Sequence, residues 1–151
     1  MASFRGANYI AIDAKGRFAV PSKYRASLEG SSIVVTIDTE DKCLLMYSLS
    51  AWLEIETKVD SLPSFNPVTR KIKRLLIGNA VELDLDASGR LLLPKNLRDY
   101  ALLDKKAVLV GQGKKIEIWG ADMWQQSCES WSNESILTAN EIPDELKALV
   151  L

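Results

Sequence analysis

One motif of thirteen residues occurs twice in this chain, and this repeat constrains the fold more than any other feature. The copies span residues 13–25 and 86–98, so they are offset by 73 positions. Both read Asp-Ala-x-Gly-Arg, then three apolar residues, a proline and, four positions after the proline, an arginine. A repeat of this kind predicts that the chain folds as two copies of one structural unit.

Each copy predicts a turn between two strands, followed by a helix. The glycine that closes each turn, Gly16 or Gly89, suits a backbone position with positive φ. After each returning strand, Pro21 or Pro94 ends the strand where a helix can begin. The predicted strands around the turns are residues 9–12, 18–20, 81–85 and 91–93.

Arg17 and Arg90 lie at the tips of the predicted turns, four residues after Asp13 and Asp86. Each arginine is expected either to form an ordinary surface ion pair with its aspartate or to be displayed toward a phosphate or a guanine edge. Because the pair occurs twice, we favour the second alternative. Arg17 and Arg90 would then contact bases, and Asp13 and Asp86 would hold them in place.

The two copies are not expected to bind equally. Lys15 in the first turn can bind a phosphate, whereas its equivalent Ser88 can only donate or accept a hydrogen bond. Arg25 and Arg98 follow the prolines, and we interpret them as structural residues that brace the turns.

Composition excludes several classes of function. The chain has no histidine, which removes the commonest general base and metal ligand. Its two cysteines are too few for a disulfide framework or a cysteine zinc site, so no metal and no cofactor are expected. No run of about 18 apolar residues and no signal-peptide pattern is present, so we expect no membrane partner and a cytoplasmic location.

A net charge of −1 argues against nucleic acid when taken alone, but the charge is unevenly distributed. Residues 1–28 hold five basic side chains and one acidic, and residues 66–98 hold seven basic and three acidic. The positive charge therefore accompanies the repeats. Because salt screens exposed charges beyond about 8 Å, DNA at the turns would respond to this local charge.

The doubled motif resembles the AbrB-type swapped-hairpin DNA-binding fold. With Phe4-Arg5-Gly6 in front, the two copies resemble the MraZ family of bacterial transcriptional regulators of the division and cell-wall gene cluster. The likeness ends near Trp124 and includes residues 41–47, 63–67, 74–78 and 109–113.

This resemblance implies an α+β fold, mainly β, in which two repeats form a pseudo-two-fold, double-psi-like swapped-hairpin barrel with short helices. It also implies a non-catalytic, nucleoid-associated regulator that assembles into a closed ring. The arginines of the two Asp-x-x-x-Arg motifs would grip short G-rich direct repeats of double-stranded DNA upstream of its own operon. In this chain those pairs are Asp13 with Arg17 and Asp86 with Arg90.

The predicted organisation has four parts. They are a first repeat at residues 1–62, a connecting helix at 63–80, a second repeat at 81–127 and an acidic C-terminal tail at 128–151. The helix should begin at Asn66 and Pro67 and run to Ile77, with an apolar side that includes Val68. Its basic residues either contact DNA phosphates or form a solvated face or subunit contact; we favour the latter.

Two other classes of function are an enzyme and a protein-interaction scaffold. An enzyme would need a site such as the carboxylates of Asp84 and Asp86, but Asp84 has no counterpart in the first copy and Asp86 belongs to the turn. No phosphate-binding glycine loop or nucleophile motif is present, and no small-molecule substrate is expected. The alternative to a DNA-binding regulator is a ring-forming scaffold that binds a protein partner, for example through its acidic tail.

Overall fold

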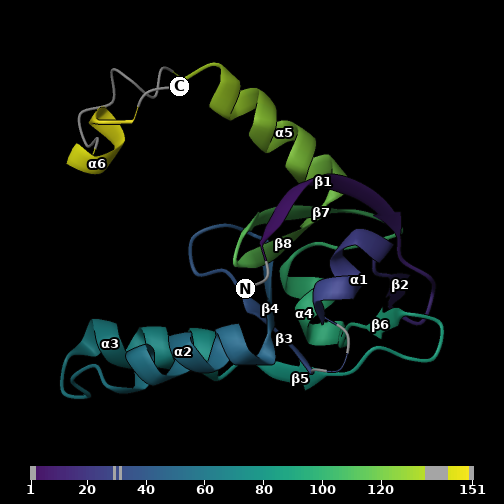
Figure 1. The fold of residues 1–151 in the computed structure, drawn as a ribbon. Helices are drawn as coiled ribbons and strands as arrows, with labels where there is room; N and C mark the ends of the chain where they lie inside the picture. The colour runs from purple at the N-terminus through teal and green to yellow at the C-terminus, as the bar shows by residue number, and fades with distance from the viewer. Residues whose placement is uncertain (1–2, 29, 31, 135–142, 150–151) are drawn as a thin grey trace. The chain divides into compact units, whose positions relative to one another are not determined.

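The computed structural model describes residues 3–28, 30, 32–134 and 143–149, and it forms two compact units, Met1–Ala121 and Asp122–Leu151 (Figure 1). The first unit contains both copies of the motif. Its elements in order are β1 (Phe4–Ala11), β2 (Arg17–Ala19), α1 (Ser22–Leu28), β3 (Ile33–Ile37), β4 (Leu44–Ser48), α2 (Leu49–Asp60), α3 (Pro67–Ile72), η1 (Lys73–Ile77), β5 (Val81–Leu83), β6 (Arg90–Leu92), α4 (Lys95–Tyr100), β7 (Lys106–Gly113) and β8 (Lys115–Gly120).

The second unit holds most of α5 (Ala121–Ser132) and all of α6 (Asp144–Lys147). In α5 the rings of Trp124 and Trp131 meet edge to face with their centroids 6.0 Å apart. Residues 135–142 and 150–151 of the predicted acidic tail lie outside the described part of the chain. None of the helices among the described residues is long and apolar enough to cross a membrane.

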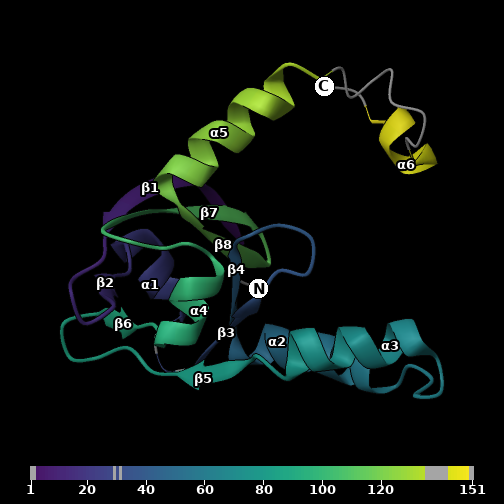
Figure 2. The same cartoon turned by 180° about the vertical axis from the view of Figure 1, so that it is seen from behind.

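The main sheet has six antiparallel strands in the order β1-β7-β8-β4-β3-β5 (Figures 1 and 2). The order is symmetric under exchange of the repeats, because β5 is the counterpart of β1, β3 of β7 and β4 of β8. The prediction of an α+β fold, mainly sheet, built from two repeats is therefore confirmed. The predicted barrel is not confirmed, because the sheet stays open with β1 and β5 as its edges.

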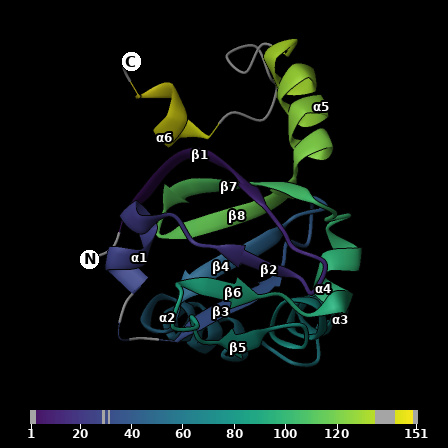
Figure 3. The ribbon, with the colours of Figure 1, turned by 90° about the vertical axis from the view of Figure 1, so that its right-hand side faces the viewer.

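The strands that flank each turn pair with strands of the other repeat. β1 lies against β7, and β2 forms a separate two-stranded ribbon with β6. The strands predicted at residues 18–20 and 91–93 are present one residue earlier, at 17–19 and 90–92, and they pair with each other. Figure 3 shows β2 and β6 side by side in front of the main sheet.

The ribbon has one buried face and one outward face. Phe18 and Leu91 pair across the strands and are 1% and 0% exposed, so they close the main core. Their neighbours along each strand point to the opposite side because side chains alternate along a strand. Leu92, directly after Leu91, is accordingly 51% exposed.

The connecting helix was predicted well at its start and less well along its length. Asn66 caps α3, since its side-chain oxygen accepts the N–H of Val68 at 2.9 Å. The helix ends in the wider turn η1, before Gly78. The prediction that Val68 lies on the apolar side is wrong, because Val68 is exposed and Thr69 is the buried residue.

The ribbon predicts a sharp difference between two adjacent leucines. Leu91→Ala should lower the free energy of unfolding by about 2–5 kcal/mol, because it leaves a cavity in a closed core. Leu92→Ala is the matched control and should change it by less than about 0.5 kcal/mol. Urea unfolding of both variants measures the difference, and equal losses would contradict the assignment of the two ribbon faces.

Candidate nucleic-acid interface

Asp13 organises the first turn and orients its arginine. One carboxylate oxygen, Oδ1, accepts the backbone N–H groups of Lys15 and Arg17, both at 2.9 Å. The other, Oδ2, accepts Nε of Arg17 at 2.8 Å. The turn is closed by backbone bonds from Gly16 N–H to the Asp13 carbonyl and from Asp13 N–H to the Arg17 carbonyl.

The second turn repeats this arrangement at every bond. Asp86 Oδ1 accepts the N–H groups of Ser88 and Arg90 at 2.8 and 2.9 Å, and Oδ2 accepts Nε of Arg90 at 2.9 Å. For each arginine, an ion pair with its aspartate is therefore compatible with display toward a phosphate or a guanine edge. Pairing with aspartate uses only Nε, and the terminal guanidinium nitrogens of Arg17 and Arg90 form no hydrogen bond with another described residue.

The turns keep both carboxylates ionised. The backbone N–H of Arg17, with further contributions from its side chain and from the N–H of Lys15, lowers the pKa of Asp13 to about 2, against a smaller opposing effect of burial. The N–H of Arg90 is likewise the largest cause that lowers the pKa of Asp86. Hydrogen bonds to the charged form have this effect because they stabilise the carboxylate over the acid.

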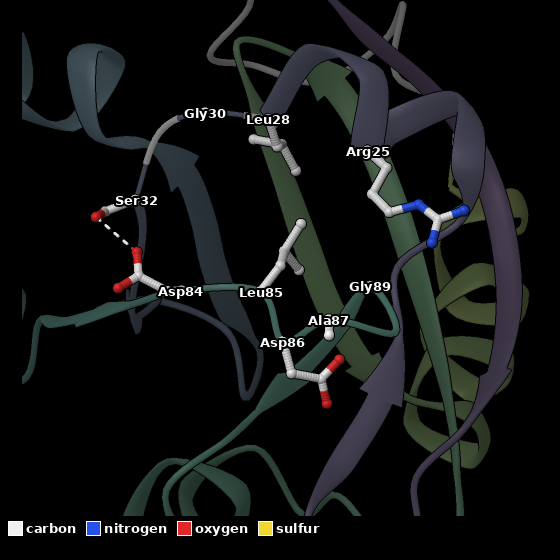
Figure 4. Close-up of a pocket in the computed structure, with 9 residues that line it drawn as sticks. All are labelled: Arg25, Leu28, Gly30, Ser32, Asp84, Leu85, Asp86, Ala87 and Gly89. Atoms are coloured by element: carbon white, nitrogen blue, oxygen red, sulfur yellow. Dashed lines mark hydrogen bonds between the residues drawn. The ribbon is translucent and has the colours of Figure 1, made fainter.

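Each turn lies against an arginine from the other repeat. Gly89 has a φ of +73°, and a Cβ at this position would collide with the guanidinium of Arg25 on α1. Figure 4 shows the Arg25 side chain extending toward the loop that contains Gly89. Gly16 has a φ of +93° and lies in the same way against Arg98 of α4. Arg25 and Arg98 therefore each lie against the turn of the other repeat, and their role as braces stays a prediction.

Backbone hydrogen bonds join the turns to the ribbon in the same reciprocal way. Val20 donates to the carbonyl of Gly89 at 3.1 Å, and Leu93 donates to the carbonyl of Gly16 at 3.0 Å. Each turn is therefore hydrogen-bonded to the chain of the other repeat.

The ribbon brings the two arginines onto one surface. Arg17 lies opposite Leu92 and Arg90 lies opposite Ala19, so all four side chains share the outward face. The arginines are diagonal neighbours, which places their Cα atoms about 7–8 Å apart. Their side chains are 31% and 39% exposed.

Sequence reasoning placed Arg17 and Arg90 at two separate tips and did not identify Ala19 or Leu92 as part of the face. The signal for Leu92 was present, because it lies two residues after Arg90 in a strand and must share its side. Lys15 and Ser88 lie between aspartate and arginine in the two turns, with exposed side chains.

The basic helix has a structural role in part. Arg70 Nη1 donates to the carbonyls of Ser64 and Phe65, and Lys73 Nζ donates to the carbonyl of Asp60. These bonds hold the connector between α2 and α3, a role that neither of the two predicted alternatives included.

Two other groups of polar residues were considered as sites. The possible ligand atoms of Asp38, Cys43 and Glu117 lie within 4.8 Å of one another. Burial raises the pKa of the Cys43 thiol, which donates to Asp38, so the thiol stays protonated and does not offer a preformed thiolate ligand. Of the carboxylates weighed for catalysis, Asp84 accepts the hydroxyl of Ser32 at 2.8 Å and Asp86 holds its turn.

The fold and the turns define a two-repeat α+β protein that presents a pair of aspartate-held arginines on one ribbon. Residues 3–75 and 76–142 each match the family described as "MraZ protein, putative antitoxin-like". The chain therefore belongs to the MraZ family.

Three relatives carry the name "Transcriptional regulator MraZ". The proteins of Coxiella burnetii (strain Dugway 5J108-111) and Pseudomonas fluorescens (strain Pf0-1) are each 50% identical to this chain over 151 residues. That of Legionella pneumophila (strain Corby) is 46% identical. Each comparison covers 98% of this chain and 99% of the relative.

The turn geometry predicts a specific acid titration. Because folding lowers the pKa of Asp13 from 3.8 to about 2, its carboxylate stabilises the fold above pH 3.8, and this contribution is lost as the pH falls toward 2. Arg17→Ala should raise this pKa only partly, since the N–H of residue 17 remains. NMR titration of the Asp13 carboxyl carbon measures this pKa, and Arg90→Ala, which leaves the first turn intact, is the control. A full return of the pKa to 3.8 in Arg17→Ala would show that the Arg17 side chain, and not the backbone N–H, is the main cause of the shift.

Proposed function

We propose that this protein is a sequence-specific DNA-binding transcriptional regulator without catalytic activity. The proposal rests on the pair of arginines on the outward ribbon face. Each is held by its aspartate through Nε, and its terminal nitrogens form no hydrogen bond with another described residue. A guanidinium fork of this kind matches O6 and N7 of guanine in the major groove. The names of the relatives support the same class of function.

The dimensions of the ribbon suit this role. The major groove of B-DNA admits a two-stranded β-ribbon. Neighbouring bases on one strand are spaced about 3.4 Å apart, so arginines about 7–8 Å apart correspond to guanines roughly two base steps apart. Ala19 and Leu92, which are exposed between the arginines, offer apolar contact to thymine methyl groups.

The finer features of the proposal follow from the family resemblance. The protein would bind short G-rich direct repeats upstream of its own division and cell-wall operon, as a closed ring in the cytoplasm, associated with the nucleoid. A ring presents identical faces to repeated boxes and so gains avidity that one ribbon lacks. Leu62, Phe65 and Val68 are exposed around the connector between α2 and α3, which supports a subunit contact there.

A titration on duplex DNA from upstream of the gene, against a scrambled duplex at fixed salt, tests this function. Arg17→Ala and Arg90→Ala should each weaken binding to the native duplex by about 5- to 150-fold, since a bidentate contact contributes about 1–3 kcal/mol. Binding to the scrambled duplex should change much less.

Arg74→Ala is the charge-matched control, because Arg74 is exposed on η1 and should leave the preference for the native duplex unchanged. Equal and weak binding of the wild type to both duplexes, unaffected by either ribbon substitution, would contradict the proposal. That result would favour the ring-forming protein-interaction scaffold.

A further inference from the structure

Two cavities flank the turns at equivalent places in the repeats. One, of about 610 Å³, lies between the first turn and the start of β7. The other, of about 400 Å³, lies between the second turn and the segment after α1 (Figure 4). Their linings correspond at the offset of the repeat for Ala11 and Asp84, for Asp13 and Asp86, and for Arg25 and Arg98. Beyond the motif, the strand register makes Lys106 the counterpart of Ser32.

The charges in these cavities do not follow the repeat. Among the described residues, the first turn and its cavity carry five basic side chains and two acidic ones, whereas the second turn and its cavity carry two of each. The basic residues without a charged equivalent are Lys15, Lys105 and Lys106, and Asp84 is an acid at the position of Ala11.

Lys105 and Lys106 are held directly beside the Asp13 turn. The N–H of Ile12 donates to the carbonyl of Lys105 at 2.8 Å, and Lys106 pairs with Ala11 at the end of β1. Both lysine side chains are exposed, and neither forms an ion pair or hydrogen bond with another described residue. They belong to the second repeat in sequence, yet they lie beside the turn of the first.

We infer that Lys105 and Lys106, together with Lys15, form a phosphate-binding site for the DNA backbone beside Arg17, and that the second turn has no equivalent. This inference rests on the proposed DNA-binding function. It adds two DNA-contacting residues, Lys105 and Lys106, and a difference between the two ends of the ribbon.

The chemistry of the two sides supports this assignment. Lysine ammonium groups are compact charges suited to phosphate oxygens, and each phosphate contact of this kind releases bound counterions from DNA. On the second side, Ser32 donates its hydroxyl to Asp84 at 2.8 Å, and the Asp84 carboxylate would repel a phosphate. The Arg17 end of the ribbon is therefore anchored on the DNA backbone, whereas DNA binding at the Arg90 end depends on contacts with bases.

The test is the salt dependence of binding by the full-length double variant Lys105→Ala/Lys106→Ala. On both the native and the scrambled duplex, the slope of log K against log salt should become shallower by about 1 to 2, since each phosphate contact contributes about 0.9. Affinity should fall by a similar factor on both duplexes, so the preference between them should remain. Both lysines are exposed, so the variant should stay folded.

The control is Lys58→Ala/Lys114→Ala, which removes the same charge from α2 and from the position after the far end of β7. Its slope should equal that of the wild type. If Lys105→Ala/Lys106→Ala leaves the slope unchanged, or changes it no more than the control does, the phosphate site is wrong. A wild type without preference for the native duplex would instead overturn the proposed function itself.

Discussion

The antiparallel pairing of β2 with β6 is the interaction on which the candidate interface depends. It is a short ribbon of three residues from each repeat, and its inner face places Phe18 and Leu91 in the core. Since side chains alternate along a strand, burying these two residues forces Arg17 and Arg90 to the outside. Stability of the core and presentation of the arginines therefore have one cause.

The turns add orientation to this presentation. A carboxylate that accepts two backbone N–H groups is fixed in direction, and its remaining oxygen fixes Nε of the arginine. The turn glycine allows a positive φ and also makes room for an arginine of the other repeat, so any side chain at Gly89 would meet Arg25. An arginine restrained in this way loses less conformational freedom when it binds a base.

Much of this architecture could be predicted from the sequence, because the determinants are local. The Asp-x-x-Gly-Arg turn, the helix cap at Asn66 and the strands of the β3–β4 and β7–β8 hairpins all rest on neighbouring residues. The register of β2 on β6 could not be predicted, because two three-residue strands have no register signal of their own. Hydrophobic periodicity misplaced Val68, since the helix packs through Thr69 and then widens into η1. Lys105 and Lys106, which lie beside the Asp13 turn, were also missed, because they are about ninety residues away in the chain.

The central claim is that Arg17 and Arg90 read guanine from one ribbon face, and guanine N7 is the atom that tests it most directly. Replacing the guanines of the native duplex by 7-deazaguanine removes this acceptor and retains Watson–Crick pairing. A hydrogen bond from a charged donor contributes about 1.5 kcal/mol or more, so wild-type affinity should fall about tenfold or more. The Arg17→Ala/Arg90→Ala variant should bind both duplexes equally. An equal loss in wild type and variant would show that other residues read the bases and would contradict the account.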